Sequence, residues 1–314
     1  MANVWITGAH GFIGRHLARG LASQGHTVVG IGYGAWPQAE AMRWGVSTWI
    51  NGEISASNLG QMRQMAGPPD RIFHLAGGSS VGATFASPQE DFTRTVVSTS
   101  QLLEWLRQHA SNVKVAAISS AAVYGASHEG AIDEATRPTP FSPYGTHKLM
   151  MEDLCRSYAA NFGLQVILPR LFSVYGIYLK KQLLWDLCSK LCAGGKVELG
   201  GTGNELRDWT DIRDVVQALD QAVCLASSLA PVLNLATGQP TSVREIAAIV
   251  VQNWADADAS IPIQFSGQGR VGDPFSLVAN VDRMQAQGIQ CAIPVTQGIA
   301  EYVDWFRNEA RVSA

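Results

Sequence analysis

Short apolar runs alternate with longer stretches of helical periodicity through most of the chain. Each run is bounded by glycine or polar residues, which is the pattern of a buried strand. We expect strands at Asn3–Thr7, Thr27–Ile31, Val46–Ile50, Arg71–Gly77, Val113–Ile118, Gln165–Leu168 and Val232–Leu235, and an amphipathic helix over Asp91–Gln108. Alternation at this spacing predicts an α/β fold with a doubly wound parallel sheet, whose ligands gather at the carboxyl ends of the strands.

The alternation loosens after about residue 170. The pattern there predicts a helix over Leu179–Cys192 that ends at Gly194, a short strand at Lys196–Leu199, helices capped by Asp211 and Ser242, and a last helix near 297–308. No internal repeat or linker separates the two regions. We therefore expect a dinucleotide-binding domain over 1–170 plus about 206–238, interwoven with a smaller α/β substrate lobe over about 171–205 plus 239–314.

The first predicted strand runs into Gly8-Ala9-His10-Gly11-Phe12-Ile13-Gly14 and then into a helix. Gly8 allows a tight turn, Gly11 lets a pyrophosphate approach the backbone, and Gly14 lets the helix pack closely. The helix N-terminus then offers free N–H groups to the phosphates. A glycine-rich turn without a ligand is the alternative, but a strand before and a helix after favour a dinucleotide cradle of the Rossmann type.

The cofactor's phosphate state stays open at the second strand. NAD-binding versions of this fold usually carry an acid there for the ribose, and NADP-binding versions an arginine, whereas Gly32-Tyr33-Gly34 offers neither. Glu53 and Ile54 follow the third strand where they could meet the adenine. His74 lies within an apolar strand, and we interpret it as a core histidine and not as a base.

A second group of chemically active residues begins at Ser142-Pro143. The serine suits a helix cap and the proline suits the first helical position. Tyr144 and Lys148 then share one helix face, and an ammonium beside a phenol favours the phenolate. The pair could move a proton near neutral pH, although two exposed side chains on an ordinary helix would show the same spacing.

Composition narrows the choice of partner. The 314 residues are 46% hydrophobic and 16% charged, which indicates a globular protein, and a net charge of −3 counts against nucleic acid or an anionic membrane. Five cysteines without a CxxC pair predict buried thiols, with no metal site. Neither a signal peptide nor an apolar run long enough to span a membrane is seen, so we expect a cytoplasmic protein.

Four motifs stand in order along the chain: the glycines 8, 11 and 14, Leu75-Ala76-Gly77, Ser120 before Val123-Tyr124-Gly125, and Tyr144 with Lys148. Together they resemble the extended short-chain dehydrogenase/reductase family, the NAD(P)-dependent nucleotide-sugar epimerases and dehydratases. Two later segments, Arg207–Val215 and Arg270–Asp273, resemble the family's nucleotide-binding segments. The resemblance covers essentially the whole chain.

The resemblance implies a role for each group. Tyr144 is the acid/base, Lys148 lowers its pKa and holds the nicotinamide ribose, and Ser120 binds the same sugar oxygen. The cofactor, NAD or NADP, contacts Gly8, Gly11, Phe12, Ile13, Gly14, Glu53, Ile54, Leu75, Ala76, Gly77, Tyr144 and Lys148. The substrate, a nucleotide-diphosphate sugar, contacts Ser80, Ser120, Tyr144, Ser173, Arg207, Arg270 and Asp273. Family members often dimerise through helices like those at 91–108 and 144–161, so a homodimer is expected.

Departures from the family pattern select among its reactions. Ala121 and Ala122 replace the acidic residues of 4,6-dehydratases, which argues against that reaction, and Thr95, Ser173 and Ile177 also differ from the usual residues. The leading hypothesis is a nucleotide-sugar 4-epimerase. The alternatives are an NADPH-dependent 4-keto-6-deoxyhexose reductase and a non-catalytic sugar-nucleotide-binding protein.

Overall fold

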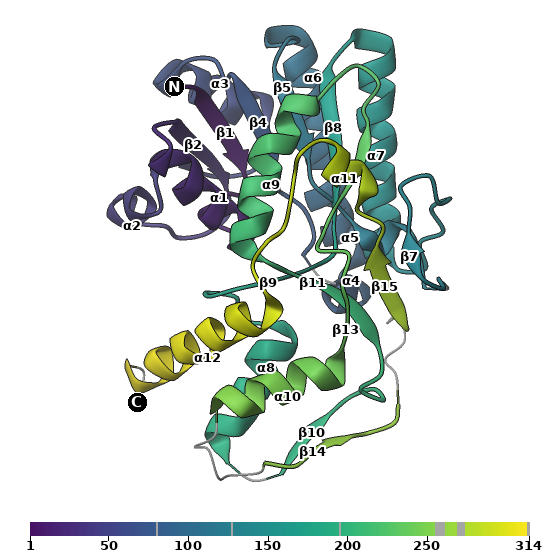
Figure 1. The fold of residues 1–314 in the computed structure, drawn as a ribbon. Coiled ribbons are helices and arrows are strands. Elements are labelled where there is room, and N and C mark those ends of the chain that lie inside the picture. The colour runs from purple at the N-terminus through teal and green to yellow at the C-terminus, as the bar shows by residue number, and fades with distance from the viewer. Residues whose placement is uncertain (80, 127, 195, 255–260, 269–273, 313–314) are drawn as a thin grey trace.

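The centre of the computed structural model is a parallel sheet (Figure 1). The structure describes residues 1–79, 81–126, 128–194, 196–254, 261–268 and 274–312. Within these ranges the sheet has eight strands in the order β12-β8-β5-β4-β1-β2-β3, with β6 also pairing with β8. They are β1 (Asn3–Thr7), β2 (Thr27–Gly32), β3 (Val46–Asn51), β4 (Arg71–His74), β5 (Lys114–Ala117), β6 (Ser119–Ser120), β8 (Gln165–Leu171) and β12 (Val232–Leu235). The predicted Rossmann-type sheet is confirmed.

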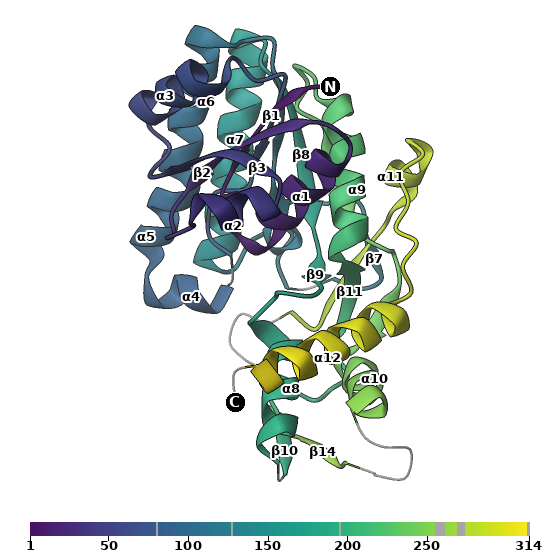
Figure 2. The same ribbon diagram turned by 90° about the vertical axis from the view of Figure 1, so that its left-hand side faces the viewer.

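Helices cover both faces of this sheet (Figure 2). One face packs against α1 (Phe12–Ser23), α2 (Gln38–Arg43), α9 (Ile212–Ala222) and α11 (Asp282–Ala286). The other face packs against α3 (Ala56–Ala66), α6 (Ser98–His109) and α7 (Pro143–Phe162). From β1 the strand order runs to β2 and β3 on one side, and from β4 it runs to β5 and β8 on the other. Doubly wound folds bind ligands at the carboxyl ends of the two strands where this order reverses, which here are β1 and β4.

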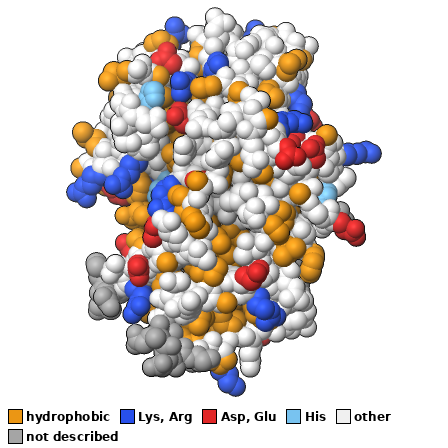
Figure 3. Space-filling model, viewed as in Figure 1, with side chains coloured by type: hydrophobic (Ala, Val, Ile, Leu, Met, Phe, Trp, Pro, Cys, Tyr) orange, Lys and Arg blue, Asp and Glu red, His pale blue; other side chains and the backbone are white. Residues whose placement is uncertain are grey.

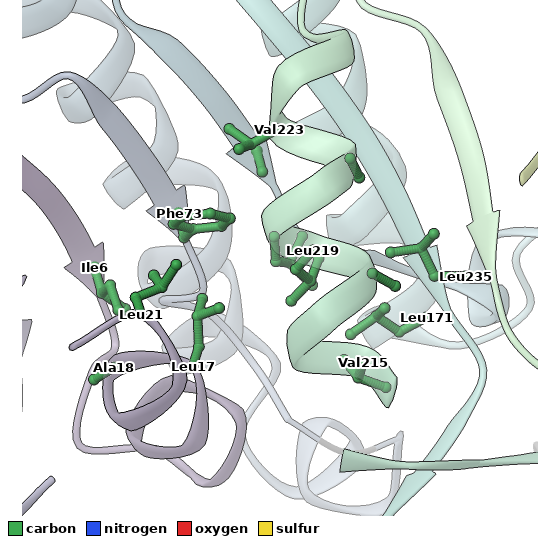
Figure 4. Close-up of a cluster of buried hydrophobic side chains, with 14 of the residues drawn as sticks. Ile6, Leu17, Ala18, Leu21, Phe73, Leu171, Val215, Leu219, Val223 and Leu235 are labelled. Atoms are coloured by element: carbon green, nitrogen blue, oxygen red, sulfur yellow. The ribbon is translucent and has the colours of Figure 1, made fainter. Parts of the chain in front are cut away.

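The helix that follows the glycine cradle is held by apolar packing. Figure 4 shows Leu17 and Leu21 of α1 on the same side of the sheet as Val215 and Leu219 of α9, all of them buried. The two helices approach closely at Gly20, because a methyl group there would lie 2.6 Å from Val216 Cγ1. This packing fixes the N-terminus of α1 relative to the sheet.

The predicted helix over 91–108 is a composite. It comprises α5 (Pro88–Phe92), a π-helical turn η1 (Thr93–Val97) and α6, and the short α4 (Val81–Ala86) precedes it. The π turn places the Thr95 hydroxyl where it accepts a hydrogen bond of 2.9 Å from the Gly78 N–H. π turns occur mostly near functional sites, and this one lies beside the loop that follows β4.

A smaller lobe lies below the sheet in Figure 1, as predicted. It contains α8 (Gln182–Ala193), β10 (Val197–Leu199), α10 (Val243–Trp254), β14 (Ile263–Phe265) and α12 (Val295–Val312), which share their own apolar core. A second sheet joins the two parts through β7 (Ala131–Ile132), β9 (Ser173–Tyr175), β11 (Leu206–Asp211), β13 (Pro240–Ser242) and β15 (Ser276–Ala279). Two short 3-10 turns complete the elements, η2 (Ala121–Val123) and η3 (Val223–Leu225). The exact division into domains stays a prediction.

Two predicted boundaries beside the cleft were wrong, and the strand expected over Gln165–Leu168 extends to Leu171. The fourth strand ends at His74 and not at Gly77, because the chain leaves the ladder to form the wall of a cleft, with Gly77 at φ +148°. The helix expected from Leu179 begins at Gln182, because Tyr178 and Gln182 both have positive φ and Lys181 occupies the N-cap. The helices of the described ranges include none that is both long and apolar enough to cross a bilayer.

Candidate active site

A cleft of about 1300 Å³ lies between the carboxyl ends of the strands and the smaller lobe. Every predicted site residue that the structure describes lines it, namely Gly8, Gly11, Phe12, Ile13, Gly14, Glu53, Ile54, Leu75, Ala76, Gly77, Ser120, Tyr144, Lys148, Ser173 and Arg207. Ser80, Arg270 and Asp273 lie outside the described residues. On the face drawn in Figure 3, Lys and Arg are interspersed with Asp and Glu and do not form one basic area.

The glycine turn at one end of the cleft fits a dinucleotide phosphate. Gly8 has φ +73°, which favours glycine, and a methyl group on Gly14 would overlap the backbone of Gly8 and Ala9. Gly11 is the N-cap of α1, a helix of 12 residues, so the free N–H groups of its first turn face the cleft. Small residues and an open helix N-terminus are what a pyrophosphate needs.

The end of β2 offers no charged side chain to a ribose. Gly32 and Tyr33 line the cleft, and the Gly34 N–H donates to Asn51 Oδ1 over 3.1 Å. Glu53 is exposed while Ile54 is buried, so the side of the cleft expected to hold the adenine offers an acidic side chain at its edge and an apolar one inside. The geometry is compatible with either phosphate state of the cofactor.

His74 belongs to a chain of hydrogen bonds behind the cleft in which both of its ring nitrogens have a partner. The Ala76 N–H donates to Thr7 Oγ1, whose hydroxyl donates to His74 Nδ1 over 2.8 Å. On the other side, His74 Nε2 donates to Thr99 Oγ1 over 2.8 Å, and that hydroxyl donates to the Thr95 carbonyl. Burial and the charge of Lys148 lower the pKa of His74 to about 3. A neutral ring that joins β1, β4 and the π turn agrees with the predicted core histidine.

Ser120, Tyr144 and Lys148 come together at the centre of the cleft. Ser142 caps α7 by accepting the Gly145 N–H over 3.1 Å, and Pro143 occupies the first helical position, as predicted. Lys148 is only 4% exposed and donates to the Ile118 carbonyl over 2.8 Å. This contact ties the helix to the end of β5, next to the segment that carries Ser120.

The pKa values of Tyr144 and Lys148 differ from the expectation. Burial raises the pKa of Tyr144, while its hydrogen bond to Ser120 acts in the opposite direction. Burial likewise lowers the pKa of Lys148 to about 8. The spacing of Tyr144 and Lys148 along the chain indicated an ammonium near a phenol, but it could not show that both groups are buried.

A buried ion pair that no local sequence pattern indicated holds the wall behind Ser120 in place. Glu152 and Arg170 are almost wholly inaccessible and make two contacts, Nε to Oε1 at 2.8 Å and Nη2 to Oε2 at 2.6 Å. Glu152 also accepts from Ser119 Oγ over 2.6 Å and from Arg156. The pair joins α7 to β8 and β6, and so holds Tyr144 and Ser120 on one rigid frame.

The side of the cleft next to the smaller lobe carries two basic residues, Lys181 and Arg207, and two acidic ones, Asp186 and Glu205. Arg207 is 9% exposed and its Nη1 donates to the Leu206 carbonyl over 2.8 Å, so its guanidinium is fixed at the cleft wall. Lys181, which the sequence reasoning did not select, reaches from the N-cap of α8 to Ser79 Oγ over 3.0 Å. Burial lowers the pKa of Lys181. Two cations in one cleft favour an anionic ligand.

Comparison with known proteins agrees with this geometry. The sequence model of the NAD dependent epimerase/dehydratase family matches residues 4–236. A UDP-glucose 4-epimerase from Mycolicibacterium smegmatis is 28% identical over 316 residues, covering 98% of this chain and 99% of that protein.

Two solved structures are similar over the same length. MoeE5 in complex with UDP-glucuronic acid and NAD is 30% identical with a TM-score of 0.85, covering 98% of this chain and 99% of that one. The UDP-glucuronic acid 4-epimerase from Bacillus cereus, with UDP-glucuronic acid and NAD, is 25% identical with a TM-score of 0.87 and the same coverage. The glycine cradle, the Ser–Tyr–Lys group and these matches together show that the chain belongs to the NAD-dependent epimerase/dehydratase family, whose cofactor is NAD(P).

Proposed function

We propose that the chain is a nucleotide-sugar 4-epimerase. The observation that carries the proposal is the meeting of Ser120, Tyr144 and Lys148 in one cleft that the glycine cradle, Lys181 and Arg207 also line. The cradle suits a dinucleotide, and the two basic side chains suit the diphosphate of a sugar nucleotide. UDP sugars are the first candidates, because the relatives named above act on them or bind them.

Each side chain has a defined part in this reaction. Tyr144 would take the proton of the C4 hydroxyl when C4 is oxidised and return it when C4 is reduced on the other face of the sugar. NAD(P), held by the glycine cradle and Lys148, would supply the reversible hydride transfer at C4. Ser120 hydrogen-bonds the same oxygen. Lys148, fixed by the Ile118 carbonyl, holds the ribose of the nicotinamide and keeps a positive charge near the phenol.

The two residues after Ser120 argue against elimination at C6. Ala121 and Ala122 both line the cleft, and neither side chain can move a proton. We therefore propose that the chain is not a 4,6-dehydratase, although the family includes such enzymes. One observation supports a second candidate, a 4-keto-6-deoxyhexose reductase: the cleft-lining residues Gly32 and Tyr33 carry no acidic side chain that would repel the extra phosphate of NADPH.

Cofactor stoichiometry separates the two reactions. The purified protein is incubated with UDP-glucose, UDP-glucuronate or a nucleotide 4-keto sugar, and the sugar product and NADPH absorbance are followed together. An epimerase interconverts the two C4 isomers without net consumption of cofactor. Consumption of one NADPH for each keto sugar, with no epimer formed, would contradict the proposal and favour the reductase.

We also propose a homodimer. Phe92, Val97 and Met150 are large apolar side chains between 37% and 43% exposed, and they lie on α5, η1 and α7, the helices expected to pair. Exposed apolar side chains on adjacent helices are typical of an interface. Light scattering of the purified chain measures the assembly directly.

A further inference from the structure

Asp91 is a buried carboxylate behind the cleft wall that the reaction above does not use. Its side chain is 5% exposed, and Oδ2 accepts a hydrogen bond of 2.5 Å from Nδ1 of His147, which is 12% exposed. Oδ1 is buried and has no hydrogen-bond partner among the described residues. A buried carboxylate oxygen left unsatisfied is costly, so its placement requires an explanation.

The unsatisfied oxygen faces the wall beside Tyr144. A methyl group placed on Gly78 would overlap Asp91 Oδ1, and the same methyl would lie 3.3 Å from Tyr144 Cδ2. The Gly78 N–H is held by Thr95 Oγ1 over 2.9 Å, so this stretch of backbone is fixed. Asp91, Gly78 and Tyr144 therefore meet at one point, with only a glycine between the carboxylate and the phenol ring.

The charge of Asp91 acts on both members of the Tyr–Lys pair. Burial raises the pKa of Tyr144, and the carboxylate raises it further. Burial lowers the pKa of Lys148, and the carboxylate, together with Glu152, opposes that change. The titratable groups of α7 that face Asp91 are His147, Tyr144 and Lys148, and α4 on the other side carries no titratable residue. One negative charge thus shifts both pKa values in the same direction.

We propose that Asp91 and His147 are a positioning pair in which the negative charge of Asp91 sets the pH range in which Tyr144 and Lys148 work. Asp91 supplies the charge, and the N–H of His147 Nδ1 orients the carboxylate by donating to Oδ2. The inference rests on the proposed role of Tyr144. It assigns a purpose to the histidine that stands between the tyrosine and the lysine on the same helix.

The test compares pH profiles of kcat/KM for three variants. Asp91→Asn keeps an oxygen acceptor for His147 and removes the charge, so both limbs of the profile should move to lower pH by roughly one unit. His147→Gln keeps an N–H donor for Asp91 Oδ2 and leaves the carboxylate charged, so its limbs should stay closer to those of the wild type than the limbs of Asp91→Asn. Asp153→Asn removes an exposed charge from the same helix and should move neither limb.

A second measurement does not need turnover. The ultraviolet absorbance change on ionisation of Tyr144 is obtained as the difference between each variant and the same variant carrying Tyr144→Phe, with the fold checked by thermal unfolding. A lower Tyr144 pKa in Asp91→Asn supports the inference even if no sugar nucleotide is converted, in which case the proposed function fails alone. Unmoved limbs and an unmoved titration in folded Asp91→Asn would overturn it, as would a His147→Gln profile that moves to lower pH as far as that of Asp91→Asn.

Discussion

Glu152 on α7 and Arg170 on β8 form a two-contact ion pair that solvent does not reach. Ser119 donates to the same carboxylate, one residue before the Ser120 that faces the cleft. The wall that carries Ser120 and the helix that carries Tyr144 are therefore joined by charge as well as by apolar packing. The stability of the fold and the geometry of the site depend on the same contact.

Replacement of Glu152 by glutamine should destabilise the protein strongly. Arg170 would keep its charge inside the core without a counter-charge, and breaking a buried pair in this way costs about 3–5 kcal/mol of unfolding free energy. Denaturant unfolding measures the loss. Asp153→Asn, in the next position of the helix but 66% exposed, is the matched control and should cost less than about 1 kcal/mol. Equal losses in the two variants would contradict the assigned importance of the pair.

The Glu152 carboxylate should also make the stability of the fold depend on pH. Burial alone raises the pKa of Glu152, but hydrogen bonds from Arg170 and Ser119 outweigh burial, and the pKa lies below its ordinary value. A depressed pKa in the folded state gives stability that is present above the unfolded pKa of about 4.3 and is lost as pH falls through the folded value. Unfolding free energy should therefore fall more steeply below this pH in the wild type than in Glu152→Gln. Parallel curves for the two proteins would refute this.

A methyl group added inside the glycine cradle should weaken cofactor binding. Gly14→Ala places a methyl group against the Gly8 carbonyl and the Ala9 backbone, neither of which can move cheaply, so NAD(P) affinity should fall by at least about tenfold. Gly60→Ala on α3 is the control, because nothing lies within 4 Å of the added methyl group and alanine favours the helix. Equilibrium binding of NAD and NADP to each variant measures the effect. Wild-type affinity in a folded Gly14→Ala variant would place the cofactor elsewhere.

We expect Lys181 to contribute to substrate affinity. Its ammonium is half-buried in the cleft and extends from the smaller lobe to Ser79 on the opposite wall. Lys181→Met should therefore remove a charged hydrogen bond to the anionic ligand. The loss is about 1.5 kcal/mol, or about tenfold in the Kd of UDP-glucose. Lys196→Met, an exposed residue outside the lining of the cleft, is the control and should leave the Kd unchanged. An unaltered Kd in Lys181→Met would remove Lys181 from the binding site.

Local sequence patterns predicted much of the fold and of the site. Strand and helix periods repeat within a few residues, so β1, the cradle and α1 could be recognised without knowledge of the rest of the chain. The Ser142 cap and the Tyr144–Lys148 spacing are likewise local. These features come together in the cleft because the parallel sheet aligns the carboxyl ends of its strands.

Contacts between distant residues could not be predicted in this way. His147 meets Asp91 across 56 positions and Lys181 meets Ser79 across 102, and no spacing rule connects them. The π turn at Thr93–Val97 brings Thr95 to the Gly78 N–H, a contact that forms only in the folded chain. The raised pKa of Tyr144 was missed for the same reason, because the extent of burial is a property of the whole fold.

The most direct test of the account is the turnover number of Tyr144→Phe. The variant keeps the ring and removes the hydroxyl, so cofactor binding and thermal stability should stay near those of the wild type. With UDP-glucose or UDP-glucuronate as substrate, the account predicts that kcat for epimerisation at C4 falls by roughly 10²–10⁴-fold, the usual contribution of a general acid/base. An unchanged kcat would contradict the central claim that this phenol moves the proton.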